Sequence, residues 1–221
     1  TTLSAFAAVT KKIRLGTGIL ITPLRGALVT AKTVATLDVL SKGRLDLGLG
    51  TGWQREEFID PGAPFADRAE RADDIIRACR ALWSTPPPVS FSSPSFSFKN
   101  LWCEPRPTQV GGIPLWFGGG ATVSTASRIA ELGNGWLPIG AMSDDDLKRG
   151  IELIRGSFAA VGRDPSTLCV RAGLPAVTDK NGDFDLEATL VPVPALAAEG
   201  VTTVSLALGR FLKNRDAINP F

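Results

Sequence analysis

Short apolar runs alternate along the chain with longer segments in which apolar residues return at every third or fourth position. The runs are typical of buried strands, and the periodic segments are typical of amphipathic helices. The predicted strands are residues 13–21, 44–50, 113–118, 135–139, 168–174 and 202–208. The predicted helices are residues 3–10, 28–40, 68–83, 123–132, 144–161 and about 185–199. Strand and helix therefore alternate almost throughout the chain.

This alternation predicts an α/β fold with a parallel sheet and right-handed crossovers. Both an open, doubly wound sheet and an eight-stranded barrel have this order of elements. Glycine and polar residues gather just after three strands, at residues 17–18, 50–52 and 118–120, where a barrel places its active site. The pattern therefore favours a TIM (β/α)8-type barrel that is incomplete, with six of its eight strand-helix units present. Residues 1–221 would form this single domain.

One segment interrupts the alternation. Residues 85–112 are rich in Pro, Ser and Phe. A structureless loop of this length is unusual in a compact domain. We therefore expect an ordered excursion with a small hairpin near Phe96-Ser97-Phe98.

The composition limits the chemistry that this chain can perform. Its 221 residues include 24 basic and 22 acidic residues, a net charge of +2, which predicts no nucleic-acid partner. It contains neither His nor Tyr. This excludes a Ser-His-Asp triad, a histidine base and a tyrosine acid within this chain.

Cysteine usage and the apolar runs indicate the compartment. Cys79, Cys103 and Cys169 lie far apart and form no CxxC pair, so we expect buried thiols, a reducing compartment and no metal site. No charged-then-apolar leader opens the chain, and no apolar run is long enough for a membrane span, so a cytoplasmic protein is expected. The first residue is Thr1 and Met142 is the sole methionine, which suggests that an upstream segment is missing.

The run Gly118-Gly119-Gly120-Ala121 has the clearest chemical potential. It lies between a predicted strand and a predicted helix, where backbone N–H groups and the helix dipole favour an anion. The run could therefore bind a phosphate group, or it could be only a tight turn. The spacing of Gly48, Gly50 and Gly52 differs from the dinucleotide-binding fingerprint.

Two sets of charged residues are further candidates. Glu56 and Glu57 follow the second glycine turn and could act as an acid-base pair, but on such a loop carboxylates are more often solvated or bound to an arginine such as Arg68. Asp38 and Arg44 flank a short loop and are predicted to form a structural ion pair on the opposite face of the barrel.

The order of these motifs resembles the luciferase-like monooxygenase family, in particular its coenzyme F-420-dependent oxidoreductase branch. The resemblance is specific through about residue 140 and weaker after Pro175. The matching residues are Ala31-Lys32-x-x-Ala35-Thr36-Leu37-Asp38-x-Leu40-Ser41-x-Gly43-Arg44, Gly48-x-Gly50-x-Gly52-Trp53-x-x-x-Glu57-Phe58, Arg68, Arg80-x-Leu82-Trp83, Pro105-x-Pro107-x-Gln109, Pro114-Leu115-Trp116-Phe117-Gly118-Gly119, Gly133-x-Gly135-Trp136-Leu137-Pro138 and Gly162-Arg163-Asp164-Pro165.

The resemblance implies a barrel that binds a flavin or deazaflavin at the C-terminal ends of its strands. The first strand here corresponds to the family's third, so the first two strand-helix units are expected to be absent. Residues 13–21 and 202–208 would then lie at open edges of the sheet or be covered by another chain. A small-molecule substrate is implied, and a homodimer remains open.

The resemblance also assigns cofactor-binding residues. The family's bulge with a non-proline cis peptide falls at Gly18-Ile19, beside Thr17. Gly50, Thr51 and Gly52 would lie beside the cofactor ring. Gly118, Gly119, Gly120 and Ala121 would bind its phosphate. No catalytic residue is identified.

Three functions remain open at this point. The first is hydride transfer between deazaflavin (coenzyme F-420) and an organic substrate, with the protein supplying orientation and phosphate binding. The second is an FMN-dependent monooxygenase of the same fold. The third is a degenerate barrel without catalysis that acts as a binding or dimer partner.

Overall fold

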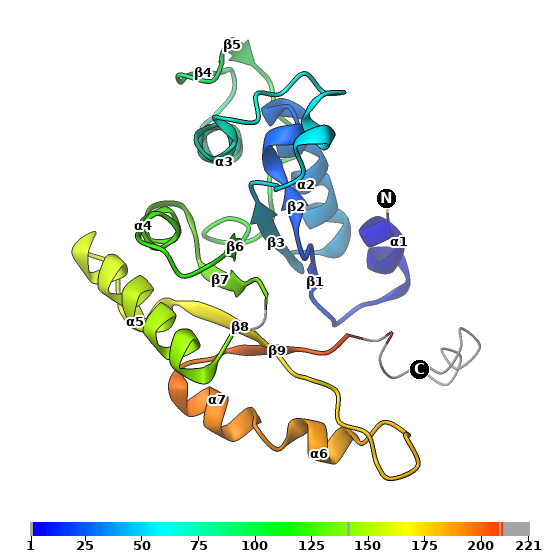
Figure 1. The fold of residues 1–221 in the computed structure, drawn as a ribbon. Helices are drawn as coiled ribbons and strands as arrows, with labels where there is room; N and C mark the ends of the chain where they lie inside the picture. The colour runs from blue at the N-terminus through cyan, green and yellow to red at the C-terminus, as the bar shows by residue number, and fades with distance from the viewer. Residues whose placement is uncertain (1, 141, 208, 210–221) are drawn as a thin grey trace.

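A curved parallel sheet forms the centre of the computed structural model, which describes residues 2–140, 142–207 and 209 (Figure 1). The order of its strands is β1, β3, β6, β7, β8, β9, and β2 also pairs with β3. The strands are β1 (Leu15–Gly16), β2 (Leu20–Ile21), β3 (Leu45–Gly50), β6 (Leu115–Gly119), β7 (Gly135–Pro138), β8 (Cys169–Gly173) and β9 (Thr203–Ser205). Within the described residues the sheet stays open, with β1 and β2 at one edge and β9 at the other. The expected incomplete barrel is confirmed.

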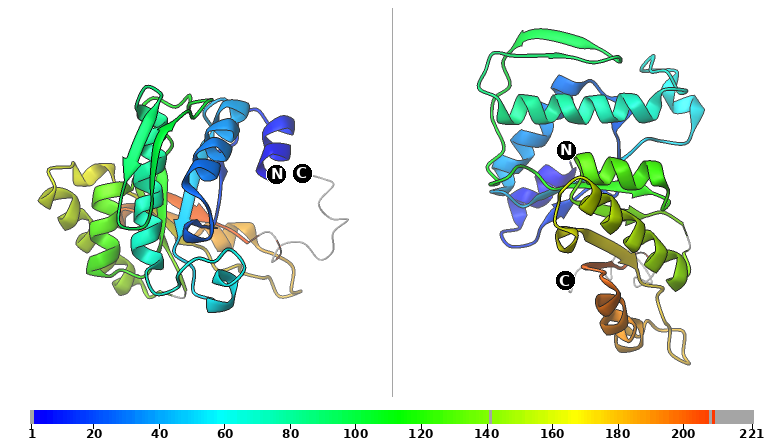
Figure 2. Two further views of the ribbon diagram at one scale, coloured as in Figure 1. Left: turned by 90° about the horizontal axis from the view of Figure 1, so that it is seen from above. Right: turned by 90° about the vertical axis from the view of Figure 1, so that its left-hand side faces the viewer.

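Helices cover the outer side of this sheet, and Figure 2 shows α3, α4 and α5 side by side against it. The α-helices are α1 (Thr2–Val9), α2 (Ala27–Ser41), α3 (Arg68–Ser84), α4 (Val123–Leu132), α5 (Asp144–Ala160), α6 (Leu186–Leu190) and α7 (Val193–Glu199). Three short 3-10 helices join them: η1 (Thr22–Leu24), η2 (Arg55–Phe58) and η3 (Pro165–Thr167). No helix in the described ranges has the length and apolar character needed to cross a membrane.

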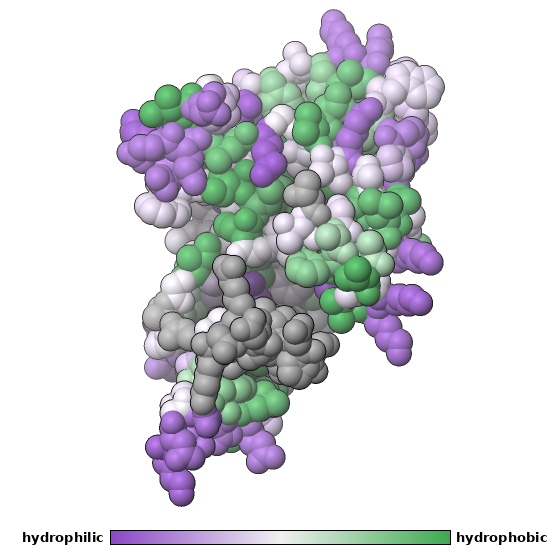
Figure 3. All heavy atoms as spheres, turned by 90° about the vertical axis from the view of Figure 1, so that its right-hand side faces the viewer, coloured by the Kyte–Doolittle hydropathy of each residue, from purple (hydrophilic) through white to green (hydrophobic). Residues whose placement is uncertain are grey.

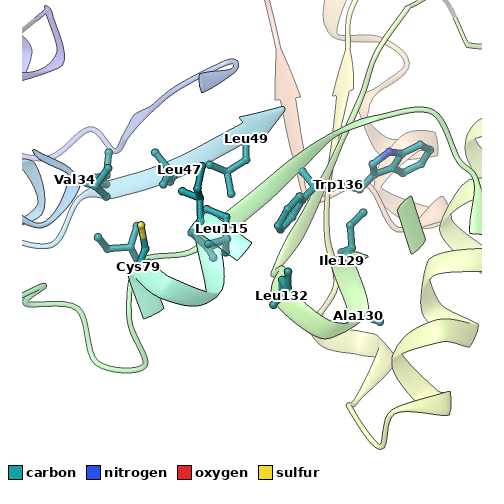
Figure 4. Close-up of a cluster of buried hydrophobic side chains, with 14 of the residues drawn as sticks. Val34, Leu47, Leu49, Cys79, Leu115, Ile129, Ala130, Leu132 and Trp136 are labelled. Carbon is teal, nitrogen blue, oxygen red and sulfur yellow. The ribbon is translucent and has the colours of Figure 1, made fainter. Parts of the chain in front are cut away.

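The core lies between the sheet and its helices because side chains alternate along each strand. On β3 the three leucines, Leu45, Leu47 and Leu49, are buried. Figure 4 shows Leu47 and Leu49 near Val34 and Cys79, which belong to α2 and α3. The intervening residues of β3 therefore face the inside of the half-barrel, which leaves its inner wall lined by Asp46 and glycines.

The first predicted strand, residues 13–21, was wrong as a single strand. It divides into β1 and β2 because Thr17, Gly18 and Ile19 stand opposite only two residues of β3, between the Gly16–Asp46 and Leu20–Leu49 pairs. The extra residue forms a bulge that interrupts the ladder.

The C-terminal elements also differ from the prediction. The helix expected at about residues 185–199 is split into α6 and α7 around Pro192, and Pro194 lies in the first turn of α7. Proline cannot continue the hydrogen-bond pattern of a helix interior. The last strand is shorter than predicted, and Leu208 lies outside the described residues.

The excursion between α3 and β6 contains the expected hairpin, formed by β4 (Val89–Ser92) and β5 (Ser97–Leu101). The buried carboxylate of Asp74 on α3 fixes it by accepting a hydrogen bond of 3.2 Å from the Ser95 backbone N–H. The Arg71 guanidinium, also on α3, lies over the Phe96 ring.

At the N-terminal ends of the strands, Asp38 and Arg44 do not form the predicted ion pair. The Asp38 carboxylate is buried and accepts hydrogen bonds of 2.7 Å from both the Thr108 backbone N–H and the Gln109 side-chain amide. Arg44 instead donates to backbone carbonyls, including those of Ala7 and Ile13. These hydrogen-bond partners of Asp38 and Arg44 are backbone groups and a side-chain amide. A pattern of charges in the sequence does not reveal such partners.

Candidate functional site

The bulge between β1 and β2 lies opposite Leu47 and Gly48 of β3. The Gly18–Ile19 peptide bond is cis, which confirms the sequence expectation. Thr17 donates a hydrogen bond of 2.7 Å from its hydroxyl to the Gly48 carbonyl, which fixes the bulge to β3. A Cβ on Gly48 would lie 2.0 Å from the Thr17 carbonyl oxygen, so only glycine fits on β3 at this point.

Ile19 brings the three predicted segments together. A Cβ on Gly50 would lie 1.9 Å from the Ile19 Cδ1, and one on Gly118 would lie 3.2 Å from its Cγ2. The isoleucine side chain therefore extends across the ends of both β3 and β6. Because Gly50 and Gly118 have no side chains, the Ile19 side chain fits over them. It forms an apolar platform at the end of the sheet.

Beside this platform lies a cavity of about 120 Å³. Four of the predicted residues line it: Gly50, Thr51, Gly118 and Gly119. Thr125 and Arg128 of α4 complete its polar wall, and the Arg128 guanidinium pairs with Asp73 of α3. Sequence reasoning did not single out Thr125 or Arg128, although both follow the glycine run on the helix that it introduces.

The N-terminus of α4 presents free backbone donors. Thr122 caps the helix by accepting a hydrogen bond of 3.1 Å from the Thr125 N–H, while the Gly119 carbonyl accepts one of 2.9 Å from the Trp136 indole. Among the described groups, the N–H donors of Val123 and Ser124 have no hydrogen-bond partner. A Cβ on Gly120 would meet nothing within 4 Å, so the approach to these donors is open. This arrangement suits an anion.

Of the seven predicted residues in the two glycine-rich segments, the other three do not line this cavity. Gly52 has a φ of 78°, and a Cβ there would lie 2.9 Å from Ile21, so its contacts are those of a tight turn. Gly120 is exposed beside the helix terminus. Ala121 packs towards Gly150 of α5 and lines a different cavity.

The acidic candidates after β3 play no part in this geometry. Glu56 and Glu57 are both exposed on η2. Arg68 does not pair with them, because it donates to the Gly52 and Phe65 carbonyls and lies over the Phe65 ring. Arg68 and Phe65 therefore stabilise the loop that follows Gly52.

A second, larger cavity of about 400 Å³ lies inside the half-barrel, on the inner face of the bulge. Thr17 and Gly18 form one wall, and Trp116 and Arg171 lie on the strands β6 and β8. The sequence analysis did not single out Arg171. Its alternation with the buried Val170 and Ala172 could have shown that its side chain faces the barrel interior.

The comparison with known families assigns the chain to a family. The sequence profile of the luciferase-like monooxygenases matches residues 1–190, so the chain belongs to this family.

Individual proteins show the same relationship. The chain is 29% identical over 195 residues to the phthiodiolone/phenolphthiodiolone dimycocerosates ketoreductase of Mycobacterium tuberculosis, covering 86% of this chain and 50% of the relative. The monooxygenase RslO1 from Streptomyces bottropensis has the same fold, with a TM-score of 0.79, 20% identity and coverage of 92% of this chain and 73% of that one.

A third comparison involves a named cofactor. The coenzyme F420 dependent tetrahydromethanopterin reductase from Methanopyrus kandleri has a TM-score of 0.66 and 25% identity, covering 90% of this chain and 63% of that one. Against curated relatives the chain spans only part of their length, 62% of one and 50% of another.

Proposed function

We propose that the protein is an oxidoreductase that transfers a hydride between deazaflavin (coenzyme F-420) and a small organic substrate. The single observation that carries this proposal is the platform of Ile19 across Gly50 and Gly118, next to an open helix N-terminus. Membership of the luciferase-like family supports the enzyme class. Two proteins similar to this chain are named as reductases, and one of them is named as dependent on coenzyme F420.

The residues present fit such a cofactor. The glycines at the ends of β3 and β6 make room for the Ile19 side chain, which supplies an apolar surface for a flat ring. The free N–H groups of Val123 and Ser124 would bind the cofactor's phosphate at the positive end of the α4 dipole. Thr51, at the rim of the smaller cavity, adds a hydroxyl near this position.

In the proposed reaction the bound cofactor supplies the redox chemistry, and the protein supplies position and environment. Ile19 would hold one face of the ring and exclude water from it. The α4 N-terminus would fix the distance between the phosphate and the ring. We further propose that residues 1–221 belong to one luciferase-like barrel domain, in which residues 85–112 are an excursion.

The runner-up is an FMN-dependent monooxygenase, favoured by the description of the family itself. The same platform and helix N-terminus would accommodate an isoalloxazine ring and its phosphate. The two functions differ in what reoxidises the reduced cofactor. An organic acceptor does so in the first function, and molecular oxygen does so in the second.

Reactivity with oxygen tests the proposal. The full-length protein is mixed in separate experiments with reduced coenzyme F-420 and reduced FMN, and reoxidation in air is followed by absorbance against the free cofactor. We expect bound reduced F-420 to remain reduced in air. Protein-accelerated oxygen consumption with FMN would contradict the proposal in favour of the monooxygenase. Binding of neither cofactor would support a non-catalytic barrel.

A further inference from the structure

The cavity inside the half-barrel contains one unbalanced positive charge. Arg14 and Asp46 both line it, and they neutralise each other through contacts of 2.6 and 2.7 Å. Arg171 lines the same cavity, and no carboxylate of the described residues pairs with it. The Arg171 guanidinium reaches the bulge, since a Cβ on Gly18 would lie 3.4 Å from its Nη1. Burial lowers the pKa of Arg171, yet an arginine remains charged at neutral pH.

Trp116 of β6 lines the same cavity. Its indole Nε1 is buried, without a hydrogen-bond partner among the described residues, so a ligand in the cavity would contact the indole ring and not this N–H.

Arg171 defines the chemistry of a ligand. Its guanidinium nitrogen atoms donate hydrogen bonds and accept none, so they suit a ligand group that only accepts. A planar guanidinium matches the two oxygens of a carboxylate, and one unpaired positive charge balances one negative charge. A phosphate dianion would leave a negative charge uncompensated.

We propose that this cavity binds the carboxylate of an organic-acid substrate through Arg171, beside the indole ring of Trp116. The inference rests on the proposed function, because it places the substrate inside the barrel while the cofactor occupies the strand ends. Arg171 fixes the charged end of the substrate beside Gly18. The remainder of the molecule extends towards the platform of Ile19.

Nuclear magnetic resonance of the full-length protein labelled with 15N-tryptophan tests this assignment. The W116F variant identifies the indole resonance of Trp116. Benzoate, its neutral counterpart benzamide, and phenyl phosphate serve as probes. We expect benzoate to shift the Trp116 resonance in a saturable manner and benzamide to leave it unchanged. Tighter binding of phenyl phosphate than of benzoate would overturn the assignment to carboxylates.

Variants of two arginines separate a specific site from a general charge effect. R171Q should weaken benzoate binding at least tenfold. R25Q removes the same charge from an exposed arginine and should leave benzoate binding unchanged. R171K keeps the charge without the planar fork and should give intermediate affinity. Should R171Q not fold, R171K decides, because wild-type affinity in that variant would overturn the proposal.

The outcomes remain distinguishable from failure of the proposed function. Benzoate binding that persists in a protein unable to bind F-420 or FMN would retain the carboxylate site and remove the hydride-transfer function. Cofactor binding with a Trp116 resonance insensitive to benzoate would remove the carboxylate site alone.

Discussion

Glycines at the ends of β3 and β6 set the geometry of the candidate site. Gly48 admits the Thr17 carbonyl and Gly50 admits the Ile19 side chain, and a Cβ at either position would lie 2.0 Å or less from an atom of the bulge. A methyl group at Gly48 would therefore force the bulge away from the sheet, and one at Gly50 would displace the Ile19 side chain. The shape of the site depends on the absence of side chains as much as on the side chains present.

Replacement of Gly50 by Ala should displace Ile19 and disturb the platform. In the full-length protein we expect affinity for F-420 to fall at least tenfold, which corresponds to about 1.4 kcal/mol. G26A is the matched control, because a Cβ at Gly26 meets nothing within 4 Å. Fluorescence titration measures the affinity, and circular dichroism checks the fold. Equal affinities for G50A and G26A would show that Ile19 does not support the cofactor.

The charge near the α4 N-terminus can be tested with two variants of nearly equal size. G119D and G119N place similar side chains beside Thr125, and both impose the same backbone requirement. Only the first adds a negative charge where the phosphate should bind. We expect G119D to bind F-420 about tenfold more weakly than G119N, a difference of about 1.4 kcal/mol. Indistinguishable titration curves would place the phosphate elsewhere and leave the glycine run as a turn.

Cys79 should be chemically inert. Burial raises the pKa of its thiol to about 12, and its S–H lies 3.5 Å from the Ala27 carbonyl oxygen. Because the thiolate is the reactive form, at pH 8 only about one molecule in ten thousand would be ionised at this site. Mass spectrometry after iodoacetamide treatment should find Cys79 unmodified in native protein and modified after denaturation. The half-buried Cys169 serves as the comparison, and faster modification of Cys79 would contradict this expectation.

At the scale of the elements, Asp74 of α3 holds the hairpin of β4 and β5 against the helix. Burial acts to raise the pKa of Asp74, but hydrogen bonds from Ser95 and Ser93 and the charge of Arg77 overcome this effect, so the pKa is lowered. The carboxylate therefore stabilises the fold while it is ionised. The hairpin and α3 are joined through this group.

Replacement of Asp74 by Ala removes the acceptor of the half-buried Ser95 N–H. We expect the free energy of unfolding to fall by about 1–3 kcal/mol at pH 7, measured by urea denaturation. A lowered native pKa means that the stabilisation is present above the unfolded pKa of about 3.9 and is lost as the pH falls through the native pKa. The difference between D74A and wild type should therefore shrink below about pH 4. D60A, at an exposed site, is the control. A difference that grew in acid would contradict this sign.

The sequence predicted most elements because their patterns are local. The helix at residues 123–132 has the bounds of α4, since its cap Thr122 and its apolar spacing lie within the segment itself. The bulge depends on pairing with β3, and the partners of Asp38 lie about 70 residues away at Thr108 and Gln109, so neither could be derived from local pattern. For the candidate site, the glycine positions were visible as loops after strands. The inward Arg171 was missed because a single charged residue in a strand carries little signal.

At the scale of the whole molecule, the open side of the half-barrel is its most distinctive surface. Figure 3 shows hydrophobic side chains gathered on this face. Exposed apolar residues of α1 and α2 include Phe6, Val9 and Val29. A groove of about 290 Å³ also runs between these helices and β3. The β1 edge of the sheet therefore coincides with apolar surface.

We propose that the bulge after β1 and the ends of β3 and β6 form a deazaflavin site. Equilibrium fluorescence titration of the full-length protein with coenzyme F-420, and separately with FMN, tests this assignment. We expect saturable binding of one F-420 per chain, at least tenfold tighter than binding of FMN. Tighter binding of FMN, or no change in F-420 fluorescence at saturating protein, would contradict it.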